Sequence, residues 1–497
     1  MYRTIIHKIC NIYPMMNPKK IFILTIIFLS VTAQASVIKV KVRNLGDWTV
    51  SFMKSTHGMI TSDKICPSLD ADSCFIIDSG DYDGIDVITF NCTKGKENIN
   101  KTFWIPFVKS VNIDFNAENK IDSDENPVVK AASDIAEQFR SDFYDYMRGQ
   151  PDRLHLHGDT IAASAYRKLT SHRDSLNTLI EKSVPENIAK VFRQDITLGT
   201  SYWFSQCAGH AKYGRQHISP QNETEWNHIL EQMKKDLELN ASENALSYIF
   251  KNTVYGYFAD YAEKENILSG PSSKETTDRL FFKYVTDNMK GKAAETICGR
   301  IIVEDNKMEM YSKWIPELAA DFYNTFPDSD LEPIIKEAVK KNLEMNSPKD
   351  MAGISFITTD SIKSVDELIS LYRGKPVLID IWATWCGPCR KSFKEHGQLR
   401  QFAAEKGVVL LYVSIDESEN AIEAVMDVAG KYGLRGEHIV TKGDLRNDIF
   451  SKFGNQRGIL SVPHTALFDK DGKLVVKRFQ ESEAPAELLK KLQTLLP

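Results

Sequence analysis

The fold of the C-terminal third is decided by residues 377–389, which read VLIDIWATWCGPC. Residues 377–382 form an apolar run broken by a single acid, Asp380, which is typical of a strand buried on both faces. The pair Cys386 and Cys389 follows this strand and opens a predicted helix. Two intervening residues let both sulfurs meet across one helical turn, so this context predicts a redox-active pair.

The chain on either side of this stretch alternates between strand and helix patterns. Residues 408–415 form a second buried strand, and residues 465–468 and 474–476 flank a polar turn. Residues 485–496 close the chain as a helix, with Pro485 suited to its first turn. Apolar strands joined by helices predict an α/β domain over residues 347–497, with a parallel or mixed sheet covered on both faces.

The quoted stretch resembles thioredoxin. Together with the lead-in 353–375 and the pair Val462-Pro463, the region 350–497 is more similar to the TlpA/ResA-type envelope thiol–disulfide oxidoreductases. The resemblance implies a thioredoxin fold and chemistry by dithiol–disulfide exchange at Cys386 and Cys389. The two sulfurs themselves carry the electrons, so no further cofactor is expected.

The resemblance also implies roles for individual residues. Asp380 is expected to be a buried acid that relays a proton to or from Cys389, and burial raises the pKa of such a carboxyl. Pro463 is expected to be a cis-proline that turns the Val462 backbone toward an extended substrate. Trp385 is expected to shield the disulfide and contact partners.

The order of the two cysteines follows from their positions. Cys386 lies at the predicted helix N-terminus, where the helix dipole favours the thiolate, and the thiolate is the attacking species. Cys389 lies one turn further in and is the expected resolving thiol. A structural disulfide without turnover is the alternative interpretation of the pair.

Three positions depart from the family pattern. Lys394 replaces a helix-kinking proline, Ser392 replaces a glutamate common in the envelope branch, and Tyr412 replaces a lysine common in cytosolic thioredoxins. These differences bear on the redox potential more than on the fold.

Two further regions precede the α/β domain. Residues 36–125 alternate apolar and polar side chains over short runs, which predicts a small antiparallel β domain, a sandwich or barrel. Residues 126–346 change to helical periodicity, which predicts an all-α region. The predicted protein is therefore a multi-domain chain of β, α and α/β parts.

The N-terminus predicts export. Lys19 and Lys20 precede the apolar run 21–29, and Ala33-Gln34-Ala35 follows as a small-x-small cleavage pattern. Residues 1–35 are therefore expected to be a signal peptide, with an uncleaved anchor as the alternative. The mature protein is expected to be soluble in the periplasm or cell envelope.

The remaining cysteines support weaker hypotheses. Cys207, His210 and His217 have part of the spacing of a metal site, but no fourth ligand is evident, so no metal is expected. A disulfide between Cys207 and Cys298 is favoured over a metal site. Cys66, Cys74 and Cys92 could include one bridged pair. Residues 79–84 have calcium-loop character but lack the glutamate that closes such a loop, which favours a solvated turn.

Composition narrows the function. The 497-residue chain has 42% hydrophobic residues, which is typical of a globular protein. Its formal charge is −5, so it lacks the excess of basic residues that is typical of proteins that bind nucleic acids. The leading hypothesis is an envelope oxidoreductase that mainly reduces disulfides of exported proteins and draws electrons from a membrane thiol donor. The alternative is a partner-binding envelope protein whose thioredoxin-like domain docks or maintains one specific partner.

Overall fold

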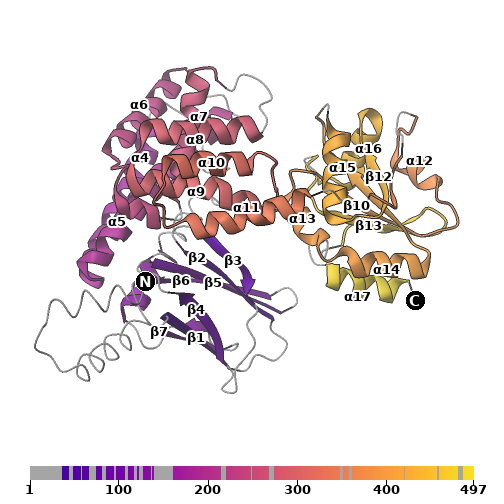
Figure 1. Cartoon of the computed structure of the whole chain (residues 1–497), viewed down its shortest axis with the longest axis horizontal. Coiled ribbons are helices and arrows are strands. Elements are labelled where there is room, and N and C mark those ends of the chain that lie inside the picture. The colour runs from indigo at the N-terminus through magenta and orange to yellow at the C-terminus, as the bar shows by residue number, and fades with distance from the viewer. Residues whose placement is uncertain are drawn as a thin grey trace, which may run out of the picture. The chain divides into compact units, whose positions relative to one another are not determined.

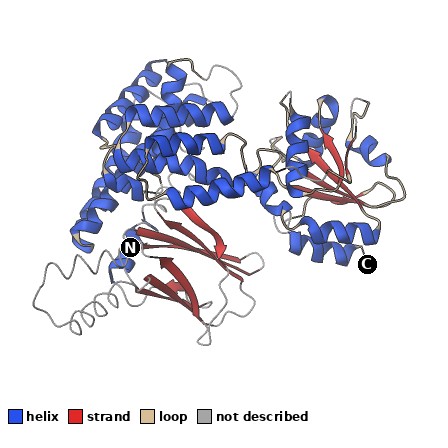
Figure 2. Ribbon diagram, in the orientation of Figure 1, coloured by secondary structure: helices blue, strands red, loops and turns tan. Residues whose placement is uncertain are grey.

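The computed structural model describes most of the chain from residue 36 onward (Figure 1). The described residues are 36–43, 49–56, 59–65, 74–80, 85–94, 97–106, 110–116, 120–122, 127–131, 133–135, 137–138, 161–213, 220–247, 249–267, 274–347, 351–357, 361–418, 420–455, 458–479 and 485–496. The expected signal peptide, residues Cys66 and His217, the side chains of Cys74 and His210, and residues 81–84 of the 79–84 loop lie outside them. Strands dominate the N-terminal part, helices the middle, and strands and helices alternate in the C-terminal part (Figure 2).

The chain separates into two compact units. The first unit contains the residues up to 272 together with 280–297, and the second contains 273–279 together with 298–497. The last helices of the predicted all-α region therefore share a unit with the α/β domain. No helix among the described residues combines the length and apolar character needed to span a membrane.

The N-terminal region forms two four-stranded sheets, ordered β3-β2-β5-β6 and β4-β1-β7-β8. All pairings are antiparallel except β1 with β7, which is parallel. The predicted small antiparallel β region is therefore present, and the β1–β7 pair departs from it, because residue alternation shows which face a side chain takes but not the direction of a neighbouring strand. The strands are β1 (Ser36–Arg43), β2 (Thr49–Thr56), β3 (Met59–Ile65), β4 (Cys74–Gly80), β5 (Ile85–Lys94), β6 (Glu97–Pro106), β7 (Ser110–Asn116) and β8 (Lys120–Asp122).

The central region is helical, as the periodicity predicted. Its described helices include α4 (Ile161–Ser183), α5 (Glu186–Tyr213), α6 (Pro220–Asp236), η1 (Ser242–Leu246), α7 (Phe250–Lys264), α8 (Lys274–Asn288), α9 (Gly291–Lys307), α10 (Ile315–Thr325) and α11 (Glu332–Asn346). Apolar side chains of α4, α5 and α6 form one buried cluster, which includes Phe204 and Trp226 with ring centroids 4.8 Å apart.

The expected Cys207–Cys298 bridge was wrong, because both residues are buried free thiols, as is Cys92. Cys207 lies on α5 inside the apolar cluster of α4, α5 and α6, and burial raises the pKa of its thiol to about 12. Cys298 lies on α9 and is fully buried. Each thiol is packed as a small apolar side chain, which is how most unreactive cysteines are accommodated.

The C-terminal region is an α/β domain built on one mixed sheet of order β14-β13-β10-β11-β12-β9. Strand β10 (Val377–Trp382) is central and buried along its whole length. It pairs in parallel with β11 (Val409–Ser414) and antiparallel with β13 (His464–Phe468). The remaining strands are β9 (Ile354–Phe356), β12 (Gly436–Val440) and β14 (Leu474–Val476).

Helices cover both faces of this sheet, as the apolar strands require. Helices α14 (His396–Lys406) and α17 (Pro485–Leu495) pack together on one side, and α15 (Ala421–Tyr432) and α16 (Gly443–Phe453) lie on the other (Figure 1). The short helix α12 (Val365–Ser370) precedes β10, and α13 (Gly387–Phe393) follows it directly. This last junction carries the cysteine pair.

Candidate active site

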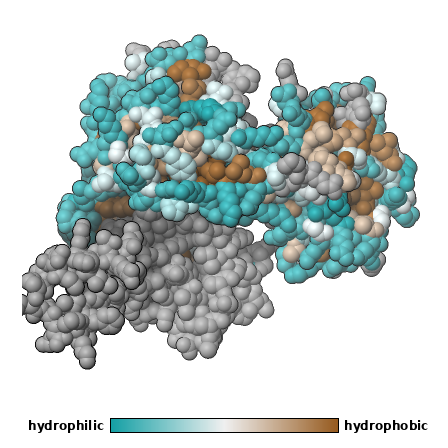
Figure 3. Space-filling view, in the orientation of Figure 1, coloured by the Kyte–Doolittle hydropathy of each residue, from teal (hydrophilic) through white to brown (hydrophobic). Residues whose placement is uncertain are grey.

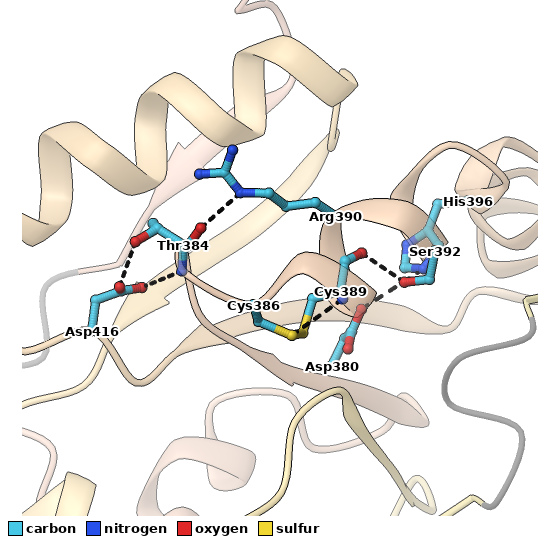
Figure 4. Close-up of a disulfide and its surroundings, with 8 residues drawn as sticks. All are labelled: Asp380, Thr384, Cys386, Cys389, Arg390, Ser392, His396 and Asp416. Atoms are coloured by element: carbon cyan, nitrogen blue, oxygen red, sulfur yellow. Dashed lines mark hydrogen bonds and ion pairs between the residues drawn. A yellow bond between two sulfur atoms is a disulfide. The ribbon is translucent and has the colours of Figure 1, made fainter. Parts of the chain in front are cut away.

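The two cysteines form a disulfide at the start of α13 (Figure 4). Cys386 is the N-cap of the helix, and its sulfur accepts a hydrogen bond from the backbone N–H of Cys389 at 3.1 Å. Pro388 lies in the first turn, where its missing N–H breaks no helical hydrogen bond. The Cα atoms of the cysteines are 5.3 Å apart, so one turn of helix places both sulfurs within bonding distance.

Burial distinguishes the two sulfurs. Cys389 is completely buried, whereas Cys386 retains 4% of its surface and follows Trp385, which is 60% exposed. The helix N-terminus and the N–H of Cys389 place partial positive charge beside the Cys386 sulfur, which favours a negative charge there. The geometry therefore suits attack by Cys386 on an incoming disulfide.

Asp380 projects from β10 beneath the disulfide, on the side of Cys389 (Figure 4). Its carboxyl is 4% exposed, and desolvation raises its pKa from 3.8 to about 7. A carboxyl with this pKa exchanges a proton near neutral pH, which is what a proton relay to a buried thiol requires.

His396 and Tyr412 extend the polar environment of Asp380, although no sequence pattern indicates a role for His396. The Nε2 atom of His396 lies 3.9 Å from Oδ2 of Asp380, and its Nδ1 lies 3.5 Å from the Tyr412 hydroxyl. Burial lowers the pKa of His396 to about 3, so its ring is neutral at physiological pH. Asp380 therefore gains no cationic partner from His396, and its pKa stays high.

The bond between Val462 and Pro463 is cis, the isomer expected from the sequence. Pro463 is buried and directly precedes β13, in which His464 pairs with Ile381 of β10. This register places the cis bond at the same end of the strands as the loop that begins after Trp382. Val462 and Cys386 thus belong to neighbouring loops at one end of the sheet.

Hydrogen bonds hold the loop that leads into Cys386. Thr384 donates from its backbone N–H and its hydroxyl to the Asp416 carboxylate, at 2.9 and 2.6 Å. Arg390 donates from Nε to the Thr384 carbonyl at 2.7 Å (Figure 4). Ser392, which replaces the family glutamate, donates to the Cys389 carbonyl at 2.8 Å. The loop and the first turn of α13 are therefore positioned by side chains on both sides of the disulfide.

A second set of contacts joins α13 to the turn between α9 and α10, within the second unit. Arg390 donates from Nη1 to the carbonyls of Glu309 and Met310, at 2.9 and 2.7 Å. The Glu309 side chain is 2% exposed and pairs with Lys394. It also accepts hydrogen bonds from the hydroxyls of Tyr311 at 2.7 Å and Tyr432 at 3.2 Å.

These contacts give a structural role to the unusual Lys394. At the position where relatives often have a helix-kinking proline, this chain has a lysine that reaches a buried carboxylate outside the α/β sheet. Sequence reasoning recognised the departure but missed Glu309, because the two residues are 85 positions apart.

We predict that Glu309→Ala lowers the free energy of unfolding of the second unit by about 2–4 kcal/mol, because it removes the buried carboxylate that binds the Tyr311 hydroxyl, the Tyr432 hydroxyl and the Lys394 ammonium group. Urea unfolding of the full chain, followed by tryptophan fluorescence, measures this loss. The matched control is Asp287→Ala, which breaks an exposed ion pair with Lys283 and should cost roughly 0.5 kcal/mol or less. Equal effects of the two substitutions would contradict a structural role for Glu309.

Of Cys207, His210 and His217, only the Cys207 side chain belongs to the described residues. Among the residues whose side chains the structure describes, no group of three histidine, cysteine, aspartate or glutamate residues is arranged to hold a metal ion.

Comparison with known proteins identifies relatives of the C-terminal domain. Residues 355–496 match the family model named Redoxin. The thiol-disulfide oxidoreductase ResA of Bacillus thuringiensis is 31% identical over 140 residues, which are 28% of this chain and 75% of that protein. The thiol:disulfide interchange protein DsbE of Escherichia coli is 32% identical over 102 residues, which are 20% of this chain and 48% of that protein.

A solved structure also resembles this domain. It is the thioredoxin domain of a thiol-disulfide oxidoreductase from Bacteroides vulgatus, with 23% identity and a TM-score of 0.21, and the match covers 26% of this chain and 84% of that one.

Proposed function

The chain belongs, through its C-terminal domain, to the ResA-like thiol–disulfide oxidoreductases, and we propose that it reduces disulfides of exported proteins in the cell envelope. The observation that carries this proposal is the Cys386–Cys389 disulfide with the buried acid Asp380 beneath it. A cysteine pair at a helix N-terminus, with a buried carboxyl of pKa about 7 beneath it, has the parts that disulfide exchange needs.

The reaction starts from the reduced dithiol. The Cys386 thiolate attacks one sulfur of the substrate disulfide, whose S–S bond breaks and releases the other sulfur as a thiolate. Asp380, in its carboxylate form, accepts the proton of Cys389. The Cys389 thiolate then attacks Cys386, releases the second substrate thiol and restores the Cys386–Cys389 disulfide. Two electrons pass from the protein to the substrate.

The substrate-binding face is proposed to include Trp385, Val462 and Pro463. Trp385 offers an exposed aromatic surface beside Cys386. Val462 precedes β13 at the end of the sheet that carries the Cys386 loop, and its backbone is proposed to pair there with an extended substrate segment. No bound cofactor takes part in this scheme.

Several features support the reducing direction and the envelope location. The dipeptide Gly387-Pro388 between the cysteines resembles that of reducing thioredoxins. The apolar run 21–29 and the Ala33-Gln34-Ala35 pattern indicate export, and N-terminal sequencing of the mature protein should begin at Ser36. Because an exported reductase needs a supply of electrons, a membrane thiol donor is the proposed partner.

The test uses the full chain with dithiothreitol as the electron donor and insulin as the polypeptide disulfide. We expect multiple turnovers of insulin reduction. The Cys389→Ser variant should trap partners in the cell as mixed disulfides at Cys386, because it cannot resolve them. Several trapped exported proteins would support a general reductase. A single trapped partner, with no insulin turnover, would favour the partner-binding alternative.

A further inference from the structure

Met308 brings a side chain from outside the thioredoxin fold to the rim of the cysteine pair. A Cβ atom added to Gly387, which lies between the two cysteines, would stand 3.1 Å from the Met308 carbonyl and 3.5 Å from the Met308 methyl group. Met308 belongs to the turn that follows α9, yet it is 56% exposed. Its thioether is therefore next to the redox motif and open to an incoming molecule.

The turn that carries Met308 is fixed in place from two sides. Towards the helices, Met308 and Met310 donate backbone hydrogen bonds to the carbonyls of Glu304 and Asp305, at 2.8 and 2.9 Å. Towards the α/β domain, the guanidinium of Arg390 binds the carbonyls of Glu309 and Met310. The backbone of Met308 is therefore held in place, while its side chain is exposed.

The backbone of this turn indicates that its shape is imposed by its surroundings. Glu309 and Tyr311 have φ angles of 57° and 47°, in the left-handed region that non-glycine residues rarely adopt. Such conformations are sparsely populated and persist where neighbouring contacts impose them. Here the buried contacts of Glu309 with Lys394, Tyr311 and Tyr432 impose them.

The side chain itself suits a polypeptide partner. Methionine is flexible and polarisable and adapts to apolar surfaces of varied shape. Hydrophobic patches lie on the surface of the C-terminal domain (Figure 3), and its exposed large apolar residues include Trp385 directly before Cys386. A polypeptide whose cysteine reaches Cys386 has to lay its flanking residues along this rim.

We propose that Met308 is a substrate-contact residue, which packs against an apolar side chain flanking the polypeptide cysteine that Cys386 attacks. The inference rests on the proposed reductase function and extends it, because it makes the helical segment part of the substrate-binding face. A small disulfide has no flanking polypeptide and gains nothing from this contact. Met308 should therefore contribute to the preference for polypeptide over small disulfides.

The test compares two substrates in the full-length protein with dithiothreitol as donor. Met308→Ala should lower kcat/KM for insulin about fivefold to tenfold, mainly through KM, as loss of a partial apolar contact predicts. The value for oxidised glutathione should stay within twofold of the unmodified protein. Met308→Leu, which keeps the apolar reach, should restore the insulin rate, and the polar Met308→Gln should not.

Met351→Ala provides the matched control. This methionine is 37% exposed and precedes β9. Strand β9 is an edge strand of the sheet and lies three strands away from β10, which leads to the cysteine pair. It should leave both substrates unaffected. Unchanged insulin kinetics in Met308→Ala, or an equal loss with both substrates, would overturn the proposed contact. If the unmodified protein reduces neither disulfide, the reductase function itself fails.

Discussion

Replacing Cys386 with serine is expected to abolish insulin reduction, because the attacking thiolate is removed and a serine hydroxyl does not exchange with disulfides. We expect no turnover above the background given by dithiothreitol alone. Cys389→Ser should also stop turnover, but it should still form a mixed disulfide through Cys386. The two variants therefore differ in their covalent products, which intact-mass measurement of the protein after reaction distinguishes.

The matched control removes a thiol elsewhere in the chain. Cys207 is a buried free thiol on α5, and burial raises the pKa of its thiol to about 12, so it has no thiolate at neutral pH. Cys207→Ala should reduce insulin at the normal rate. Turnover by Cys386→Ser, or its loss in Cys207→Ala with an intact fold, would contradict the assignment of the chemistry to the Cys386–Cys389 pair.

Asp380→Asn is expected to leave the fold intact and slow insulin reduction by about 10²–10⁴-fold, the usual effect of removing an acid–base group. The carboxylate is the form that accepts the proton of Cys389. Because the pKa of Asp380 is about 7, turnover by the unmodified protein should rise between pH 6 and 8. The asparagine variant should lose this rise. Equal turnover of the two proteins across this range would contradict the relay.

Although Asp380→Asn should lower activity, it should raise the stability of the folded protein. In the folded protein the Asp380 pKa is raised from 3.8 to about 7, so folding favours the protonated carboxyl. The folded state then holds a proton that the unfolded state has lost, and stability falls as pH rises from about 4 to about 7. Asp380→Asn removes this loss and should stabilise the oxidised protein at pH 8 by roughly 2–4 kcal/mol.

Urea unfolding at pH 8 and pH 4 measures this effect, and comparing the variant with the unmodified protein at each pH cancels the contributions of other titrating groups. The difference between the two proteins should nearly vanish at pH 4. Asp287→Asn, at an exposed site on α8, should show no such pH dependence. A destabilising effect of Asp380→Asn at pH 8 would contradict a buried, protonated carboxyl.

Much of the C-terminal domain could be predicted from residues 377–389. The buried strand, the helix start and the cysteine pair lie within 13 consecutive positions, so local patterns were enough to predict them, and the resemblance to thioredoxins added the expected role of Asp380. The cis bond at Val462-Pro463 was expected from the resemblance to the thioredoxin family, not from a local pattern.

Other features depend on contacts between distant parts of the chain. Glu309 meets Lys394 across 85 positions, and no pattern around Glu309 distinguishes it from a surface glutamate. His396 lies next to Asp380 only because α14 packs against the sheet. The parallel pairing of β1 with β7 and the separate burial of Cys207 and Cys298 likewise depend on tertiary packing that periodicity does not record.

The central claim is that Cys386 is the attacking thiol and Cys389 the buried resolving thiol. The most direct measurement reduces the full-length protein, exposes it to limiting iodoacetamide at pH 7 and maps the labelled peptides. The account predicts that Cys386 is labelled first, because it lies at the rim and at the helix N-terminus while Cys389 is completely buried. Labelling of Cys389 before Cys386 would contradict it.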